Sequence, residues 1–255
     1  MKLSNQAHGC NEHLGKRSTI NRLSKYLTAA TKPAFWPGLS KGVMPAVEHI
    51  EAIRRYSPKT LIDVGANKGQ FSLMARYVFP DLEIHAFEPL ESERKIYERV
   101  VQPPARTYPV AVGRTKSEAT FFVTSRADSS SLLRPAAAQE AAYGVQAKTS
   151  ITVPVMRLSE VVDLSTLPRP ILLKLDVQGG ELDVLKGVES SLPLIDLIYC
   201  EASFVELYQG QPLASEIVAY LASQNLNLRG VFNQSITSGF GPTQADFLFS
   251  RDSNV

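Results

Sequence analysis

Three charged residues stand near the ends of stretches that otherwise resemble buried strands. Lys174 and Asp176 alternate with leucines in "ILLKLDV" (171–177), and Glu201 lies in "DLIYCEA" (196–202). Burying a charge is costly unless it is paired or does work. Two interpretations of Lys174 and Asp176 therefore stay open: a buried ion pair that supports a loop, or groups with a chemical role. Since ligands bind beyond the carboxyl ends of parallel strands, we expect Asp176 and Glu201 to converge there.

Two convergent carboxylates are suited to two kinds of chemistry. A carboxylate whose pKa is raised by a like-charged neighbour can take a proton from a weakly acidic hydroxyl group. Two carboxylates together with Gln178 can instead supply the oxygen ligands that Mg²⁺ prefers. The four histidines form no ligand-spaced cluster, which argues against a zinc site. We predict Asp176 as base or metal ligand, assisted by Glu201, with Lys174 beside them.

A glycine-containing loop follows an earlier apolar stretch, in "TLIDVGANKGQFSL" (60–73). The loop lacks the GxxxxGK pattern of a phosphate loop, and Asn67 stands where a dinucleotide fingerprint has its middle glycine. Gly65 lets the chain turn sharply off the strand, and Gly69 lets the following helix start close under a ligand. Free N–H groups in such a loop can bind a carboxylate as readily as a phosphate.

A second anchor for a ligand ends the next strand. "HAFEP" places Glu88 at the strand tip, where an acid is positioned to accept both hydroxyls of a ribose. Taken alone, Glu88 could equally be a surface glutamate before a helix. The neighbouring glycine loop favours ribose recognition.

The elements that must position these residues alternate along the chain. Predicted strands lie at 60–65, 83–89, 107–113, 171–177, 196–202, 226–232 and 245–250, and predicted helices at 45–56, 69–78, 91–101, from 181 and near 213–224. Strands rich in Ile, Leu and Val, separated by helices, imply a mostly parallel sheet covered on both faces. The loop between the last two strands is too short for a crossover helix, so these strands should pair antiparallel.

Two further segments are expected at the ligand edge of the sheet. The region from about 115 to 158 is an insertion with two additional strands, at 118–124 and 150–158, joined by a loop. The segment "FNQSITSGFGPTQ" (232–244) is predicted as a loop that contacts an acceptor. "KPAFWPGLSKG" (32–42) is predicted as a loop as well.

With these motifs assembled, the sequence resembles the FkbM family of S-adenosylmethionine-dependent methyltransferases. The resemblance spans roughly residues 43 to 251 and rests on "LIDVGANKGQFSL", "HAFEP", "SSSLL", "LLKLDVQGGELDVLKG", "YCEASFVELYQGQP" and "DFLF". It implies a Rossmann-like class I methyltransferase domain over 43–255, with a seven-stranded, mostly parallel sheet whose last strand is antiparallel. It also implies O-methylation of a hydroxyl group of a saccharide, glycan, or glycosylated or polyketide-type metabolite.

The resemblance assigns roles to the motif residues. The loop is expected to hold the methionine end of S-adenosylmethionine and Glu88 its ribose, while Ser130 of the serine motif contacts cofactor or acceptor, unless that motif is a plain turn. The expected cofactor-binding residues are Asp63, Gly65, Ala66, Asn67, Gly69, Gln70, Phe71, Glu88, Ser130 and Asp176. The expected catalytic residues are Asp176, Glu201 and Lys174, and a Mg²⁺ ion would be held by Asp176, Glu201 and Gln178.

Composition and charge bound the remaining properties. Residues 1–42 contain seven Lys or Arg and one acid, in a chain of net charge +2, so we predict a basic N-terminal arm, either a solvated terminus or a lid over the site. No stretch is apolar for long enough to span a membrane and the start lacks a signal sequence. With two distant cysteines, these features favour a cytoplasmic protein with a small-molecule or glycan acceptor.

Two alternatives remain beside the saccharide O-methyltransferase. A nucleic-acid ribose 2′-O-methyltransferase is suggested by Lys68, Lys174, Asp176 and Glu201, which loosely match a Lys/Asp/Lys/Glu arrangement, and by the basic arm. The acidic body and the lack of interleaved basic and aromatic residues argue against a nucleic-acid partner. A non-catalytic cofactor-binding protein with the same fold is the other alternative, and the intact motif residues argue against it.

Overall fold

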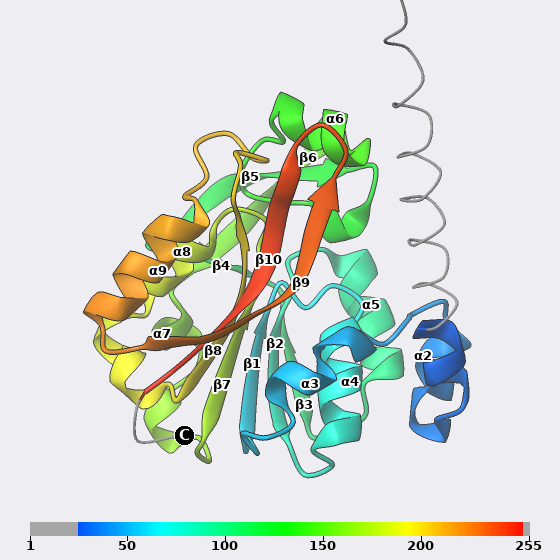
Figure 1. Cartoon of the computed structure of the whole chain (residues 1–255). Coiled ribbons are helices and arrows are strands. Elements are labelled where there is room, and N and C mark those ends of the chain that lie inside the picture. Colours follow the sequence, from blue (N-terminus) through cyan, green and yellow to red (C-terminus); the bar gives the residue numbers. More distant parts are fainter. Residues whose placement is uncertain (1–24, 252–255) are drawn as a thin grey trace, which may run out of the picture.

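The computed structural model describes residues 25–251, and its centre is a seven-stranded sheet with the order β3-β2-β1-β7-β8-β10-β9 (Figure 1). The strands are β1 (Thr60–Val64), β2 (Glu83–Phe87), β3 (Ala105–Tyr108), β7 (Ile171–Leu175), β8 (Leu197–Ser203), β9 (Asn227–Thr237) and β10 (Gly241–Ser250). Neighbouring strands from β3 to β8 pair parallel, whereas β10 is antiparallel to both β8 and β9. The predicted fold, a mostly parallel sheet with an antiparallel last strand, is confirmed.

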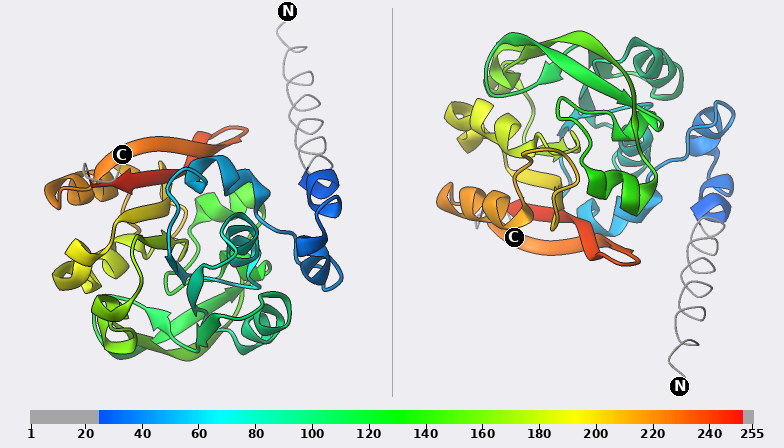
Figure 2. Two further views of the ribbon diagram at one scale, coloured as in Figure 1. Left: turned by 90° about the horizontal axis from the view of Figure 1, so that it is seen from below. Right: turned by 90° about the horizontal axis from the view of Figure 1, so that it is seen from above.

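Helices cover both faces of this sheet (Figures 1 and 2). One face packs against α3 (Ile50–Ile53), α4 (Gln70–Val78) and α5 (Glu91–Val100), and the other against α7 (Leu158–Val161), α8 (Glu181–Gly187) and α9 (Ala214–Ser223). Each face has its own apolar core, since successive side chains of a strand point to opposite faces. Leu172 of β7 belongs to the first core and Leu173 to the second. Both faces of the central strands are therefore buried, which explains their near-continuous apolar composition.

The insertion forms a second, three-stranded sheet of order β4-β6-β5. Its strands are β4 (Ala111–Val112), β5 (Ser117–Thr124) and β6 (Ala147–Met156), and between β5 and β6 lie the 3-10 helix η3 (Ala127–Ser129) and helix α6 (Ala137–Tyr143). The prediction of one strand over 107–113 is wrong. β3 ends before Pro109, which cannot donate to a ladder, and the chain then joins the small sheet as β4. The Ala-rich stretch expected within a loop is helix α6.

Three further segments differ from prediction. The expected acceptor loop at 232–244 is a β-hairpin, in which β9 and β10 pair as far as Thr237 and Gly241. The expected helix at 45–56 is reduced to the 3-10 helix η2 (Val47–His49) and α3, because the chain must leave helical geometry before Pro58. The expected loop at 32–42 contains η1 (Pro33–Phe35) and α2 (Trp36–Leu39), begun by a proline in the first helical turn, a favoured position.

The remaining described segments are short connections and one N-terminal helical stretch. Short 3-10 helices η4 (Leu164–Thr166) and η5 (Glu189–Leu194) complete the connections of β7 and β8, and residues 25–30 are helical. The first 24 residues of the predicted basic arm, with Cys10, lie outside the described residues. Over the span 25–251, no helix has both the length and the apolar character that a bilayer crossing requires.

Candidate active site

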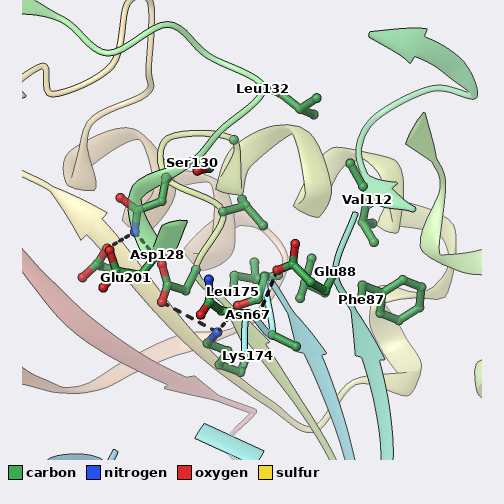
Figure 3. A pocket seen from close by; sticks show the side chains of 18 of the residues that line it. Asn67, Phe87, Glu88, Val112, Asp128, Ser130, Leu132, Lys174, Leu175 and Glu201 are labelled. Atoms are coloured by element: carbon green, nitrogen blue, oxygen red, sulfur yellow. Dashed lines mark hydrogen bonds and ion pairs between the residues drawn. The ribbon is translucent and has the colours of Figure 1, made fainter. Parts of the chain in front are cut away.

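A cavity of about 910 Å³ opens at the carboxyl ends of β1, β2, β7 and β8 (Figure 3). Its walls come from the glycine loop, the strand ends, the inserted sheet, the β9–β10 hairpin and the segment before β1. Of the site residues predicted from the sequence, Gly65, Ala66, Asn67, Gln70, Phe71, Glu88, Ser130, Lys174, Asp176, Gln178 and Glu201 line it. The structure therefore brings nearly all of the predicted residues to one cavity, and Asp63 and Gly69 lie outside its lining.

Gly65 is required by a close approach between two strand ends. Its φ is +76°, and a Cβ atom at this position would overlap the carbonyl oxygen of Asp176. The absence of a side chain thus lets the loop after β1 and the loop after β7 lie against each other. This contact places the glycine loop and Asp176 on the same wall of the cavity.

The expectation that the loop offers free N–H groups to a ligand is wrong for residues 65 to 69. The N–H groups of Gly65 and Ala66 donate to Phe87 O, and that of Gly69 donates to Ala66 O. Asn67 N donates to a Glu88 carboxylate oxygen, and Lys68 N donates to Asn67 Oδ1. The loop is therefore a preformed, internally bonded turn, and Gly65, Ala66 and Asn67 line the cavity.

Gly69 has a packing role that differs from the predicted one. Its φ is +90°, and an added Cβ would lie 2.6 Å from Val101 Cγ2 and 2.9 Å from Tyr97 Cδ2. The glycine lets the start of α4 pack against α5, instead of bringing the helix under a ligand. Gly69 therefore supports the site indirectly, through the packing of α4 on α5.

Lys174 forms the buried ion pair that was one of the two interpretations of Lys174 and Asp176, but its nearer partner is Asp63, while Asp176 Oδ2 lies 3.7 Å away. Lys174 Nζ lies 3.0 Å from Asp63 Oδ1 and donates to Gly65 O at 3.0 Å, while Ser72 Oγ donates to Asp63 Oδ2 at 2.6 Å. Burial by itself lowers the pKa of Lys174, but the carboxylates of Asp63 and Asp176 outweigh it and the net shift is upward. Lys174 is thus a permanently charged prop under the glycine loop.

Glu88 presents a buried carboxylate to the cavity from the tip of β2 (Figure 3). Its oxygens accept from Asn67 N at 2.9 Å and from Leu90 N at 2.8 Å. Burial raises the pKa of Glu88 to about 7, although both backbone hydrogen bonds act in the opposite direction. Each oxygen keeps a lone pair for a further donor.

Gln178 joins the two carboxylates predicted to act together. Its Nε2 donates to Asp176 Oδ1 at 2.6 Å and to Glu201 Oε2 at 3.0 Å, and its Oε1 accepts from Tyr208 OH at 2.8 Å. Burial raises the pKa of Glu201 well above its ordinary value, and Asp176 adds to the shift. Burial also raises the pKa of Asp176, against the opposing effect of Lys174. The predicted convergence of Asp176 and Glu201 is therefore present, with an amide group between them.

This arrangement does not support the expected Mg²⁺ site. Gln178 directs its amide nitrogen, a donor, toward both carboxylates, whereas a metal ligand would have to offer its oxygen. Among residues 25–251, no group of three or more His, Cys, Asp or Glu side chains has an arrangement that could hold a metal ion.

The loop that carries Asp176 and Gln178 is held by Glu181. The carboxylate of Glu181 accepts from Val177 N at 3.0 Å and from Gly179 N at 3.0 and 3.1 Å. Burial raises the pKa of Glu181 to about 7. Ser131 Oγ donates to Gln178 O at 2.7 Å, so the serine motif braces the same loop.

A polar cluster on the cavity wall consists of His49, Tyr199, Asn233 and Asp246, all of which line the cavity. Asn233 lies in the segment 232–244 that was predicted to contact the acceptor, and the other three residues were missed from the sequence. Asp246 pairs with Glu201 across β10 and β8, and Tyr199 pairs with Lys174 across β8 and β7. Asp246 carried a usable signal, because it is a charged residue in an otherwise apolar strand, as Lys174 is. His49 lies in a short helical segment and carried none.

The opposite part of the cavity, near Glu88, is apolar. Phe87, Val112 and Leu132 line it (Figure 3), and Phe121 and Val155 of the inserted sheet pack in the same cluster as Leu132. The cavity therefore combines an apolar compartment suited to a flat ring with a carboxylate beside it and a polar compartment around Asp176, Glu201 and Asp246.

Comparisons with known proteins agree with this geometry. A family model described as the methyltransferase FkbM domain matches residues 63–228. Hexuronic acid methyltransferase AglP of Haloferax volcanii is 28% identical over 142 residues, which cover 55% of this chain and 54% of AglP. Methyltransferase 1 of Beauveria bassiana is 27% identical over 157 residues, which cover 55% of this chain and 63% of that protein. The matches thus span less than two thirds of either relative.

Two solved structures of low sequence identity are also among the matches. The O-methyltransferase TomG of Streptomyces achromogenes, solved with S-adenosylmethionine, has a TM-score of 0.49 at 13% identity, covering 91% of this chain and 96% of TomG. Fibrillarin of Aeropyrum pernix, also solved with S-adenosylmethionine, has a TM-score of 0.44 at 11% identity, covering 84% of this chain and 72% of that one.

Proposed function

The chain belongs to the family of FkbM methyltransferases, and on this premise we propose that it is an S-adenosylmethionine-dependent O-methyltransferase. The acceptor is a hydroxyl group of a saccharide, a glycan, or a glycosylated or polyketide-type metabolite. The methyltransferase domain comprises residues 43–255, with the arm of residues 1–42 before it. The observation that carries the proposal is one cavity into which the strand-tip carboxylate of Glu88 and the Asp176–Glu201 pair both open.

The residues of the cavity fit the parts of this cofactor. Glu88 accepts the ribose hydroxyls, and the apolar residues Phe87, Val112 and Leu132 contact the adenine. The carboxylates of Asp176 and Glu201 complement a positively charged ligand beside them. When bound there, S-adenosylmethionine supplies an electrophilic methyl group on a sulfonium cation. The close approach of Gly65 to Asp176 fixes the distance between the glycine loop and the carboxylate of the loop after β7.

The polar compartment fits an acceptor with several hydroxyl groups. Carboxylates, amides and hydroxyls line it from β7, β8, β9 and β10, including Asp176, Glu201, Asn233 and Ser235. Such a lining can hydrogen-bond and orient a sugar ring, and orientation is most of what an in-line displacement needs from the protein. The name of the relative AglP supports a saccharide acceptor. The carboxylates of Asp176, Glu201 and Asp246 disfavour a polyanion such as nucleic acid.

A thermal-shift titration of the full chain tests the cofactor. S-adenosylhomocysteine should stabilise the protein, by about 2.7 kcal/mol at a hundredfold excess over Kd, whereas NAD and ATP should not. Each titration is repeated with Mg²⁺, which should add nothing if the carboxylate pair works without a metal. Stabilisation by NAD instead, or by none of the three, refutes the proposal.

A further inference from the structure

A histidine–aspartate pair lies in the polar compartment of the cavity. His49 Nδ1 is 3.2 Å from Asp246 Oδ2 and 2.9 Å from Tyr199 OH. Asp246 Oδ2 also accepts from Tyr199 OH at 3.1 Å and from Asn233 Nδ2 at 2.8 Å. The imidazole ring is held between Phe71 and Tyr199, each with a centroid distance of 5.5 Å. Four separate elements thus fix one ring in one orientation.

The charge of Asp246 favours one tautomer of His49. A proton on Nδ1 is attracted by Asp246 and can be donated to Tyr199 OH at 2.9 Å. Asn233 Nδ2, a donor 3.1 Å from Nδ1, acts against this tautomer, but its two protons also reach Asp246 Oδ2 at 2.8 Å and Tyr199 OH at 3.4 Å. The other ring nitrogen, Nε2, then carries the lone pair. Within residues 25–251, Nε2 has no hydrogen bond; Glu48 Oε1 lies 3.8 Å away and is itself paired with Lys25 at 2.8 Å.

The other titratable groups near the acceptor are less suited to receive a proton. Both oxygens of Glu201 are engaged, by Gln178 and Gln244. Asp176 Oδ1 accepts from Gln178, and Asp176 Oδ2 lies 3.7 Å from the ammonium group of Lys174. Burial and the charge of Asp246 raise the pKa of Tyr199, so its hydroxyl group stays a donor to Asp246. His49 combines a free lone pair, a partner for the resulting cation and a place on the cavity wall.

We propose that His49 is the catalytic base for the acceptor hydroxyl, in place of Asp176, and that Asp246 is its positioning residue. This inference rests on the proposed methyl transfer. As the acceptor oxygen bonds to the methyl carbon, the methyl–sulfur bond breaks and its electron pair leaves with S-adenosylhomocysteine, while the O–H bond breaks and its electron pair stays on oxygen. The proton forms a bond with Nε2, and the imidazolium is stabilised by Asp246 until it releases the proton to water.

The tautomer of His49 gives a test that needs no acceptor. Long-range ¹H–¹⁵N spectra are recorded on the ¹⁵N-labelled full chain with S-adenosylhomocysteine, and His49→Gln assigns the signal. We expect neutral His49 to carry its proton on Nδ1 and none on Nε2, and Asp246→Asn to remove this preference. Asp183→Asn, which removes a cavity carboxylate on α8, is the control and should change nothing. A wild-type signal with the proton on Nε2 overturns the inference.

Turnover supplies the second readout, with radiolabelled S-adenosylmethionine and a panel of methyl glycosides as probe acceptors. His49→Gln should lower kcat by about 10²- to 10⁴-fold and remove the acid limb of the kcat–pH profile, whereas Asp176→Asn should keep that limb. The charged groups facing His49 are Asp246, Glu48 and Lys25. The variants His49→Gln and Asp176→Asn leave all three in place. An unchanged acid limb in His49→Gln overturns the inference. If S-adenosylhomocysteine does not stabilise the wild type at all, that result would instead refute the proposed function.

Discussion

Replacing Glu88 with glutamine should change how cofactor affinity depends on pH. Burial raises the pKa of Glu88 to about 7 from the ordinary 4.5. Protonated Glu88 is a weaker acceptor for ribose hydroxyls than the carboxylate: hydrogen bonds to a charged group contribute about 1.5–3 kcal/mol and neutral ones about 0.5–1.5 kcal/mol. The difference, about 1–1.5 kcal/mol, corresponds to roughly tenfold in Kd. Wild-type affinity for S-adenosylhomocysteine should therefore strengthen about tenfold between pH 6 and pH 8.

The same pKa shift also affects the stability of the ligand-free protein, with the opposite sign. Because the folded-state pKa is raised, the stabilising contribution is complete below pH 4.5 and is lost as the pH rises through about 7. A shift of this size corresponds to about 3 kcal/mol. Glu88→Gln should remove that loss, so its free energy of unfolding should fall less than that of the wild type between pH 4.5 and pH 8.

Isothermal titration calorimetry at pH 6, 7 and 8 measures the affinity, and urea denaturation measures the stability. Glu98→Gln is the control and should leave both measurements unchanged, since Glu98 is exposed on α5 and lies outside the cavity lining. We expect Glu88→Gln to bind S-adenosylhomocysteine at least tenfold more weakly at pH 8, with little dependence on pH. Equal affinities of Glu88→Gln and wild type at all three pH values would refute the assignment of Glu88 to the ribose.

Three further predictions concern the frame of the site. Gly65→Ala should weaken S-adenosylhomocysteine binding by at least tenfold, because the new Cβ displaces the chain at Asp176. The control Gly144→Ala, also at positive φ but with open space around it, should cost about 1–2 kcal/mol of stability and leave Kd unchanged. Equal Kd values for the two variants would contradict this prediction. Lys174→Met should lower the free energy of unfolding by about 3–5 kcal/mol, because it leaves the Asp63 carboxylate buried without its cation. A loss below about 1 kcal/mol in urea denaturation would show that the ion pair does not stabilise the fold. Glu181→Gln should flatten the pH dependence of stability, since the raised pKa of Glu181, about 7, makes the wild type lose stability as the pH rises through that value. If the free energy of unfolding of the variant changes between pH 5 and pH 8 as much as that of the wild type, Glu181 is not the source of this pH dependence.

Local sequence patterns determined much of the fold and half of the site. Apolar runs bounded by Gly and Pro located the strands, and the residues at or just after their carboxyl ends, Gly65, Glu88, Asp176 and Glu201, were placed correctly at one cavity. This worked because the ends of parallel strands meet at one edge of a sheet, so a residue's place in its own strand is enough to predict its neighbourhood. Prediction of local structure was weaker where pairing between distant segments decided it, as at 107–113 and 232–244.

Only the tertiary structure decided which groups are free to do chemistry. The sequence showed that the loop after β1 has N–H groups, but not that Phe87 and Glu88 already accept from them. It showed acids at two strand ends, but not that Gln178 lies between them. The pairing of His49 with Asp246 depends on β10 lying next to β8 and on the segment before β1 covering that edge. Such contacts join residues far apart in the chain, and no local propensity or spacing encodes them, because they arise from strand order and register.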